Sequence, residues 1–473
     1  MQDLVVVNPS ARKEMLGSLE PLAGIEPPLW AALIAGFIRD YGHSVSIIDA
    51  EVEGLSPEEI AQKILELDPR LVAIVALGQN PSATSTPKMP AVRSLLNILD
   101  RQVKTALVGI HPSSLPERTL REEKVDYVCR GEGFWTILDL LQRSPIAASG
   151  LSFLYEGDFI STAKAPLVDV NLLPRAAWDL LPIERYRAHN WHCFGDLDNR
   201  QPYAVIFGSL GCPFYCHYCN IHALYNGRPG RRTRVPLAVV QEIDYLVESY
   251  KVKNFKFVDE LFAFGTGYVT EICDLLIKRD YDLNIWVYGR IDTISEEMLE
   301  KMRRAGIRWI GYGIESINED VRQSVGKKFK AQAILEAVEK TRQAGIYING
   351  NFIFGLPEDS YETMRETLGV AKALNFEYVN FYTTMAYPGS DLYRITSPKD
   401  LPESWSGYGQ YSPDATPLPT KHLASKTVLV FRDNAFQEYF QRPEYLSMIL
   451  EKFGQNTVDH VKEMLKYPIR RNE

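Results

Sequence analysis

The sequence predicts an α/β protein with two βα units and a helical tail. Short apolar runs rich in Val, Ile and Phe alternate with helix-like segments through two long stretches of the chain. Polar and glycine-rich motifs follow many of these runs, and the alternation stops near residue 396. We therefore expect four parts: a doubly wound, Rossmann-like sheet in 1–145, a linker with a β-hairpin in 146–195, a partial (β/α)6 barrel in 196–395 and a mostly helical extension in 396–473.

The first unit is predicted from five strand-like runs separated by helix-like segments, which indicates a doubly wound sheet. The expected strands are 3–8, 44–49, 71–77, 103–109 and 125–129. The linker follows, with a hairpin over 150–162 that turns at Glu156-Gly157-Asp158.

The second unit repeats the strand and helix alternation six times, which indicates parallel strands joined by crossover helices. The expected strands are 203–208, 254–259, 284–289, 308–314, 347–355 and 378–384. Six strand–helix repeats make an incomplete barrel, and the active site of such a barrel lies at the carboxyl ends of its strands. The tail beyond residue 396 is rich in Pro, Tyr and Ser before it becomes helical, and it is a candidate cover for the barrel opening.

Composition narrows the class of protein. The 473 residues are 45% hydrophobic and 24% charged, and six cysteines are too few for a disulfide framework. A net charge of −8 argues against nucleic acid as a partner. No signal peptide or membrane span is evident, so we expect a cytoplasmic protein. One dense basic cluster, Arg228, Arg231, Arg232 and Arg234, is either a solvated turn or a contact for anionic groups.

Three cysteines after the first barrel strand are the strongest chemical signal. Cys212, Cys216 and Cys219 have the spacing Cys-x3-Cys-x2-Cys within GSLGCPFYCHYC (208–219). Three thiolates on a four-iron cluster leave one iron open to another ligand. A closed zinc site that adds His222 is the alternative, although zinc modules are usually small and autonomous. A c-type haem is excluded because Asn220 follows the last cysteine.

The cysteine spacing, the Gly-Cys-Pro entry and Tyr218 resemble the radical S-adenosylmethionine (SAM) superfamily. The resemblance implies a [4Fe-4S] cluster on the three cysteines and SAM on its open iron. The segments GIES (313–316) and GLPED (355–359) are similar to family segments that hold SAM. By this resemblance Tyr218, Glu315, Ser316, Phe352 and Gly355 contact SAM, and Arg290 contacts its carboxylate. Asp259, Glu260, Tyr288 and Asn351 are candidate substrate contacts.

The first unit resembles the cobalamin-binding domain of cobalamin-dependent radical SAM enzymes. The similar segments are 27–49, GIHPS (109–113) and RGEG (130–133), whereas Trp30 and Phe134 replace a glycine and a glutamate common in the family. The strand-end residues implied to contact cobalamin are Asn8, Gln79, Asn80, Ser82, Gly109, His111, Gly131 and Glu132. Because no Asp-x-His-x-x-Gly signature is present, we expect no histidine on cobalt, with the loop 79–86 on the lower face. The alternative is a domain that only packs against the barrel.

Together these resemblances predict a cobalamin-dependent radical SAM methyltransferase that methylates an unactivated centre of a small metabolite, with an electron donor such as a flavodoxin or ferredoxin. The corrin and the cluster then share one active site between the domains. A second hypothesis keeps both cofactors but ends in oxidation, cyclisation or rearrangement. A third is a cobalamin carrier or sensor with an inert barrel.

Overall fold

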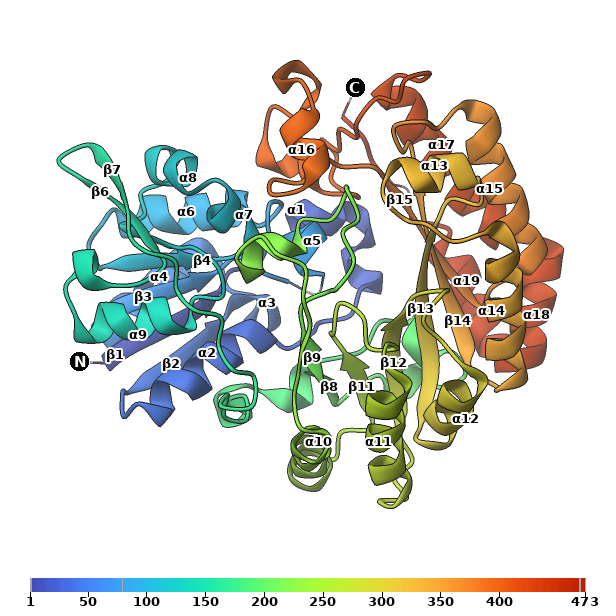
Figure 1. The fold of residues 1–473 in the computed structure, drawn as a ribbon, viewed down its shortest axis with the longest axis horizontal. Coiled ribbons are helices and arrows are strands. Elements are labelled where there is room, and N and C mark those ends of the chain that lie inside the picture. Colours follow the sequence, from blue (N-terminus) through green and yellow to red (C-terminus); the bar gives the residue numbers. More distant parts are fainter. Residues whose placement is uncertain (1, 79, 468, 473) are drawn as a thin grey trace.

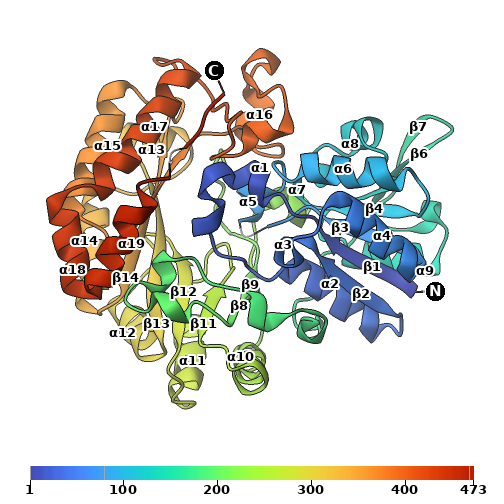
Figure 2. The same ribbon diagram turned by 180° about the vertical axis from the view of Figure 1, so that it is seen from behind.

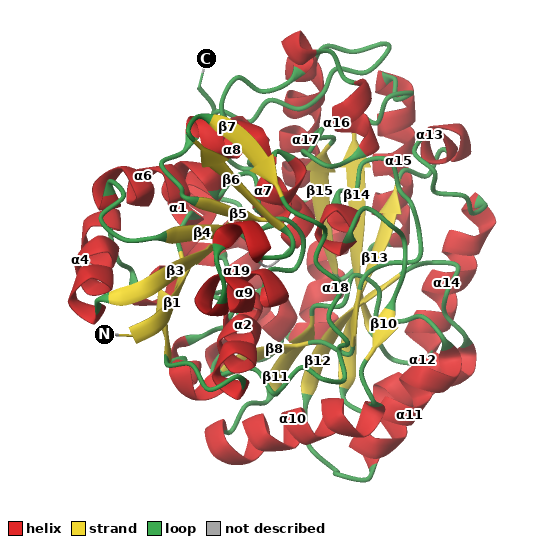
Figure 3. Cartoon of the chain, turned by 60° about the vertical axis from the view of Figure 1, so that its left-hand side comes forward, coloured by secondary structure: helices red, strands yellow, loops and turns green. Residues whose placement is uncertain are grey.

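Two large β-sheets lie side by side, each covered by helices, in the computed structural model of the chain (Figure 1). The structure describes residues 2–78, 80–467 and 469–472. The amino-terminal sheet occupies one half of the molecule and the barrel-like sheet the other, and the view by secondary structure shows both in one frame (Figure 3). This arrangement brings the carboxyl ends of strands from both sheets to the space between them.

The amino-terminal sheet has the strand order β2-β1-β3-β4-β5-β6-β7 within the described residues. The first five pair in parallel, as predicted, and β6 and β7 pair antiparallel beside β5. The hairpin assigned to the linker therefore extends this sheet. The strands are β1 (Gln2–Asn8), β2 (Val45–Asp49), β3 (Pro69–Val75), β4 (Thr105–Val108), β5 (Tyr127–Cys129), β6 (Leu151–Tyr155) and β7 (Asp158–Ser161).

Alternate residues of β1 belong to different cores, as expected for a sheet with helices on both faces. Leu4 and Val6 join the core that contains α2 and α9, whereas Val5 and Val7 join the core that contains α4 and α6. The helices of this half are α1 (Arg12–Leu16), α2 (Leu29–Asp40), α3 (Ala50–Glu53), α4 (Pro57–Leu67), α5 (Pro81–Thr84), α6 (Met89–Leu99), α7 (Ile110–Ser114), α8 (Pro116–Glu122) and α9 (Phe134–Gln142).

The second sheet is the predicted partial barrel. Its parallel strands have the order β15-β14-β13-β12-β11-β8, and within the described chain the outer strands β8 and β15 do not pair with each other. The strands are β8 (Tyr203–Ile206), β11 (Asn254–Phe257), β12 (Asn284–Gly289), β13 (Ile307–Glu315), β14 (Tyr347–Phe354) and β15 (Tyr378–Thr383). The helices are α10 (Pro236–Tyr250), α11 (Thr266–Ile277), α12 (Glu296–Arg304), α13 (Glu319–Ser324), α14 (Ala331–Gln343) and α15 (Tyr361–Leu374).

The carboxyl-terminal extension packs on the barrel and also reaches the first domain. Helices α17 (Ser425–Phe440), α18 (Pro443–Phe453) and α19 (Gln455–Met464) lie on the β15 side of the barrel (Figure 2). Ahead of them, α16 (Asp391–Ile395) leads to a segment in which the Trp405 ring packs 4.5 Å from the His111 ring. The extension therefore links the two domains.

A buried ion pair also joins the domains. Glu26, just before α2, accepts a hydrogen bond from Lys256 on β11 at 3.0 Å and one from the Tyr203 hydroxyl at 3.2 Å. Both charged side chains are less than a tenth exposed. Among the described residues no helix is long and apolar enough to cross a membrane.

Candidate active site

The cysteine loop is an insertion between two short strands. It leaves β9 (Ser209–Leu210) and returns as β10 (Arg232–Thr233), which pairs antiparallel with β9. Gly211 has φ +92°, and a Cβ there would lie 2.4 Å from the Gly230 carbonyl oxygen. The Gly230 amide also donates to the Cys212 carbonyl oxygen at 3.0 Å. Glycine at 211 thus lets the two sides of the loop meet at its base.

Two strand-end carboxylates hold this loop. Asp259 accepts from the Gly208 amide at 2.8 Å and from the Ser209 hydroxyl at 2.6 Å, and it is fully buried. Glu260 accepts from the Gly211 amide and the Tyr225 hydroxyl, each at 2.8 Å. Burial raises the pKa of Glu260 to about 7. Both carboxylates were expected to contact substrate, but in the structure their hydrogen bonds go to the cysteine loop and hold it in place.

The three cysteines fit an iron-sulfur cluster by their donor chemistry. All are free and partly buried, and burial raises the pKa of Cys212 to about 12 and of Cys219 to about 11. The backbone amides of Phe214 and Ile221 face these two sulfurs and oppose the rise. Without iron the thiols of Cys212 and Cys219 stay protonated, and iron would deprotonate its ligands because a coordinating thiol loses its proton.

The zinc alternative is not supported by the position of His222. Its Nε2 lies 2.8 Å from the Phe214 carbonyl oxygen, and its ring stacks on Tyr215. Over the described part of the chain, no three His, Cys, Asp or Glu side chains surround a point that can hold a single metal ion. A tetrahedral zinc site needs all its donors around one ion, whereas each cluster cysteine binds a different iron.

Two of the predicted SAM residues converge beside the cysteine loop. Glu315 ends β13 with φ +66°, and its carboxylate accepts from the Tyr218 hydroxyl at 3.0 Å. Lys327, which sequence reasoning missed, donates to the same oxygen at 2.6 Å, and both charged groups are buried. Lys327 follows a turn that packs on the loop, because the His217 amide donates to the Val325 carbonyl oxygen.

Arg290 and Ser316 occupy different environments. The Arg290 guanidinium lies 4.1 Å from the centre of the Phe214 ring, and its Nε donates to Asp292 at 2.6 Å. Arg290 is therefore beside the cysteine loop. Ser316 is fully buried, and its hydroxyl lies 3.2 Å from the Thr367 hydroxyl. Its side chain holds α15 against the end of β13 rather than facing open space.

Phe352 and Gly355 differ from their predicted places. The Phe352 ring packs with Phe376 and Phe381 in the outer layer between the sheet and its helices. The next residue, Ile353, packs in a cluster with Tyr218, because neighbouring strand residues face opposite sides. The expected adenine contact therefore does not come from the Phe352 side chain. Gly355 has φ +79°, and a Cβ there would lie 2.4 Å from a Val428 methyl carbon of α17.

The strand ends of the first domain form a compact polar network. Asn8 at the end of β1 donates to Asp49 and accepts from Lys88, both at 2.7 Å. Burial raises the pKa of Asp49 to about 6. Gly109 leaves no space for a Cβ, which would lie 2.6 Å from the Ala76 carbonyl oxygen. The backbone of neighbouring strand ends is therefore in close contact here.

The loop after β3 reaches the cysteines. Ser82 on α5 places its hydroxyl oxygen 3.5 Å from the Cys219 sulfur. Asn80 precedes α5 and its carbonyl oxygen accepts from the Thr84 hydroxyl, while Gln79 lies outside the described residues. The Ser82 contact joins the predicted cobalamin loop directly to the predicted cluster loop.

His111 is buried away from the interdomain space. Its Nδ1 lies 3.2 Å from the Thr86 hydroxyl, and its ring meets the edge of Trp405. Burial lowers the pKa of His111 to about 3, so the ring is neutral at physiological pH.

The RGEG motif contacts the barrel side of the interface. Gly131, with φ +94°, accommodates the Leu224 carbonyl oxygen. Glu132 pairs with Arg232 at 2.5 Å and accepts from the Val168 amide. Trp30 donates to the Glu132 carbonyl oxygen and packs 5.5 Å from Phe134. Trp30 and Phe134, the two departures from the family pattern, thus pack on each other.

A cavity of about 70 Å³ lies between the two sheets, lined by Asn8, Trp30 and Gly78 of the first domain and by Val205, Val258 and Glu260 of the barrel. Small and polar residues at the strand ends fit a cofactor approached by backbone. The residue types therefore fit cobalamin here, whereas the cysteine loop fits a cluster.

Comparison with known proteins agrees with this division of the chain. The radical SAM superfamily model matches residues 206–371, and the B12 binding domain model matches residues 18–141. The chain belongs to the cobalamin-dependent radical SAM family. An uncharacterized methyltransferase of Pyrococcus horikoshii is 28% identical, over 94% of each chain.

Two further relatives extend the comparison. An anaerobic magnesium-protoporphyrin IX monomethyl ester cyclase of Rubrivivax gelatinosus is 26% identical over 91% of this chain and 79% of its own. The structure of the radical SAM methyltransferase TsrM from Kitasatospora setae, with cobalamin and a [4Fe-4S] cluster bound, has a TM-score of 0.72 at 16% identity. That match covers 98% of this chain and 99% of TsrM. This radical SAM enzyme therefore has the TsrM fold over nearly its whole length.

Proposed function

We propose that this enzyme methylates an unactivated centre of a small molecule at the interface between its two domains. The observation that carries the proposal is the 3.5 Å contact between Ser82 of the B12-binding domain and Cys219 of the cluster loop. Because this contact joins the two cofactor loops, one substrate can reach both sites. The nearly full-length similarity to a protein named as a methyltransferase supports methyl transfer as the outcome.

When bound, the cluster with SAM supplies a 5′-deoxyadenosyl radical, and cobalamin supplies the methyl group. In this chain Cys212, Cys216 and Cys219 hold the cluster, and Asp259 and Glu260 fix the backbone that carries them. The three cysteines are partly buried, which limits the contact of a reactive radical with water.

SAM is held by the group of residues that faces the cysteine loop. The Glu315 carboxylate, kept in place by Tyr218 and Lys327, is suited to a positively charged amino group. The Arg290 guanidinium is suited to a carboxylate. Arg290 is hydrogen-bonded to Asp292, and Glu315 to Lys327. Bound SAM would therefore replace Asp292 as a partner of Arg290 and Lys327 as a partner of Glu315.

Cobalt receives no protein histidine in this proposal. His111 faces Thr86 and Trp405, whereas His43 precedes β2 and its Nδ1 lies 3.8 Å from the Asp3 carboxylate, at the amino end of the strands. The residues Asn8, Ser82, Gly109, Gly131 and Glu132 surround the cofactor through backbone and short side chains. A flavodoxin or ferredoxin in the cytoplasm reduces the cluster.

A second candidate function keeps both cofactors but ends in oxidation or ring closure. The similarity to a protein named as a cyclase favours it. The two outcomes differ in the fate of the SAM methyl group, which enters the product only in methylation.

The test follows the methyl group of SAM. The reconstituted enzyme is incubated under anaerobic conditions with methyl-labelled SAM, a reductant and a candidate substrate. Label in the product supports methylation, whereas deoxyadenosine with no labelled product supports the second function. Cys216→Ala should abolish deoxyadenosine formation and spare cobalamin binding, and Cys273→Ala on α11 serves as the control. Cobalamin bound with no deoxyadenosine from the wild type would instead indicate a carrier.

A further inference from the structure

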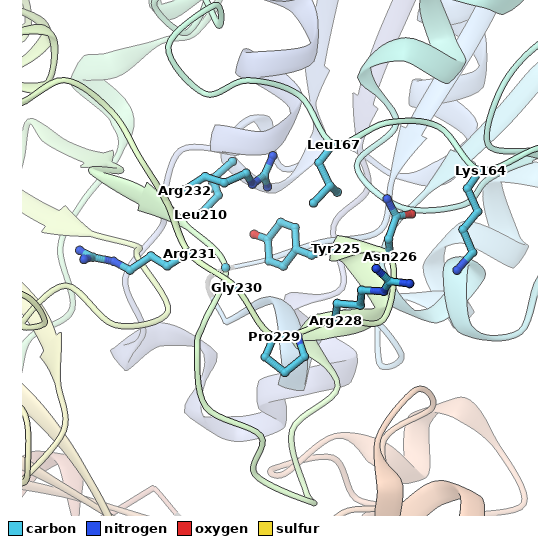
Figure 4. Close-up of a pocket in the computed structure, with 11 residues that line it drawn as sticks. Lys164, Leu167, Leu210, Tyr225, Asn226, Arg228, Pro229, Gly230, Arg231 and Arg232 are labelled. Carbon is cyan, nitrogen blue, oxygen red and sulfur yellow. The ribbon is translucent and has the colours of Figure 1, made fainter.

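A basic cavity lies beside the cysteine loop, apart from the contacts assigned above. It has a volume of about 530 Å³ and is the larger of the two cavities described (Figure 4). Residues of the linker, of β9 and of the loop that returns to β10 line it: Lys164, Leu167, Leu210, Gly211, Tyr225, Asn226, Arg228, Pro229, Gly230, Arg231 and Arg232.

The four basic side chains that line this cavity differ in whether other protein groups already bind them. Arg232 is neutralised by Glu132 at 2.5 Å. Arg231 points away from Tyr225 (Figure 4) and donates to the Ser209 hydroxyl and the Phe264 carbonyl oxygen. Among the described residues, Lys164 and Arg228 have no ion pair and no side-chain hydrogen bond, and both are exposed. Two cations are therefore free to meet a ligand.

Apart from Asn226, whose side-chain amide donates to the Ala165 carbonyl oxygen, the remaining side chains of the wall are mostly apolar. Leu167, Leu210 and Pro229 line the cavity, and the Tyr225 ring lies at its centre, where its hydroxyl is already bonded to Glu260 (Figure 4). A volume of this size is typical of sites for small organic molecules. Free cations at an apolar cavity suit a molecule with an apolar body and an oxyanion.

We propose that this cavity binds the oxyanion of an amphipathic molecule through Arg228 and Lys164, and that this anion is part of substrate recognition. The chain as a whole is acidic, with a net charge of −8, so these cations form a local site in a repelling field. Of the two interpretations of the basic cluster, the solvated turn and the contact for anionic groups, this proposal adopts the second for Arg228 and adds Lys164.

The position of the cavity connects it to the reaction centre. Leu210 lines both this cavity and the interdomain cavity, and the Gly230 amide donates to the Cys212 carbonyl oxygen. A molecule anchored here can extend towards the cluster. This role in substrate recognition rests on the proposed function. Two molecules can bring the oxyanion: the substrate, through a carboxylate or phosphate, or cobalamin, through its phosphodiester.

The first experiment measures anion binding without turnover. Reconstituted enzyme is titrated with 8-anilinonaphthalene-1-sulfonate and with N-phenyl-1-naphthylamine, which has the same apolar body without the sulfonate. Lys164→Ala/Arg228→Ala should weaken sulfonate binding at least tenfold, because the variant removes both cations that pair with the sulfonate, and a factor of ten corresponds to about 1.4 kcal/mol. Binding of the uncharged probe should stay unchanged. Lys278→Ala/Arg304→Ala, which removes exposed charges at the ends of α11 and α12, is the matched control.

The second experiment separates the two sources. Cobalamin and cobinamide, which lacks the phosphodiester and nucleotide, are titrated into the wild type and the double variant. Loss of cobalamin affinity with unchanged cobinamide affinity assigns the anion to the cofactor and overturns its role in substrate recognition. Unchanged affinity for both, with weakened sulfonate binding, assigns it to the substrate.

Sulfonate and cobalamin binding that both equal the wild type would overturn the proposal. If only the rate of cluster reduction by a flavodoxin then falls in the double variant, the cations dock an acidic protein instead, and the proposal is equally refuted. These binding results do not depend on methyl transfer, so a failure of the proposed function is recognised separately, by the fate of labelled SAM.

Discussion

Lys327 is the residue whose removal should disturb the site most directly without touching a cysteine. Its ammonium lies 2.6 Å from Glu315, and both side chains are less than a tenth exposed. Lys327→Met would leave a buried carboxylate with only the Tyr218 hydroxyl as partner. Breaking a buried pair from one side costs about 3–5 kcal/mol, and we expect the free energy of unfolding to fall by that amount in urea titrations.

The double variant Lys327→Met/Glu315→Gln is the control for this prediction. It removes both charges, so most of the lost stability should return. A double variant as unstable as Lys327→Met alone would show that lost packing, rather than an unpaired charge, causes the effect.

Asp359 gives a pH dependence with a definite sign. It accepts hydrogen bonds from the Gly355 and Leu356 amides and from Thr363, yet burial outweighs these and raises its pKa from 3.8 to about 6. The folded state thus favours the protonated acid. This stabilisation is complete well below pH 3.8 and is lost as the pH rises through 6. Because one pKa unit corresponds to about 1.4 kcal/mol, the shift from 3.8 to about 6 amounts to roughly 3 kcal/mol of unfolding free energy.

Asp359→Asn does not titrate and should lack this dependence. The stability of the wild type relative to Asp359→Asn should therefore fall by roughly 2.4 kcal/mol between pH 4 and 7, measured by urea unfolding of the cofactor-free chain. Parallel stability curves for the two proteins would contradict the assignment.

Single residues were predictable where a motif fixes the backbone. Glu315 and Tyr218 were both expected near SAM, and the structure brings them within 3.0 Å of each other. Phe352 was expected on the same side, but the pleat of β14 turns it outward and presents Ile353. Lys327 and the contact of Ser82 with Cys219 depend on segments far apart in the chain, which no local pattern reports.

The cysteine loop is the element most dependent on one backbone conformation. Gly211→Ala would place a Cβ 2.4 Å from the Gly230 carbonyl oxygen at φ +92°. The two sides of the loop must then separate, and we expect iron bound after anaerobic reconstitution to fall to less than about half of the wild-type amount, because the cysteines lose their shared geometry.

Gly227→Ala is the matched control for the loop. Gly227 also has a positive φ, +76°, but a Cβ there meets nothing within 4 Å. Only the left-handed conformation is penalised, by about 1–2 kcal/mol, and iron content should stay near that of the wild type. Equal iron loss in both variants would point to backbone strain rather than to the contact at the base of the loop.

The strands were largely predictable because buried parallel strands appear as continuous apolar runs. All eleven predicted strands lie within a few residues of their expected bounds among the described residues. The hairpin of β6 and β7 was predicted as an element but assigned to the linker. Its place beside β5 depends on pairing between edges, with Val128 opposite Ser152, and hydrophobic periodicity does not encode that choice.

At the scale of the whole molecule, buried ion pairs and hydrogen bonds join the two domains. Glu26 pairs with Lys256, Glu132 pairs with Arg232, and Tyr186 of the linker donates to Asp49 at 2.7 Å. A buried pair fixes relative position because a shifted domain would leave each charge unpaired in a medium that solvates it poorly. The charges therefore align the B12-binding domain with the barrel.

Lys256→Met tests this alignment. The variant leaves Glu26 buried beside Tyr203 with no cation, and burial already raises the pKa of Glu26. We expect a loss of about 3–5 kcal/mol of unfolding free energy, which Lys256→Met/Glu26→Gln should largely recover. Because the uncompensated charge lies between the domains, the first urea transition should separate them, and limited proteolysis should then cut the linker segment 162–202, between β7 and β8, before either sheet. Single-step unfolding with the linker protected would contradict a role of this pair in domain alignment.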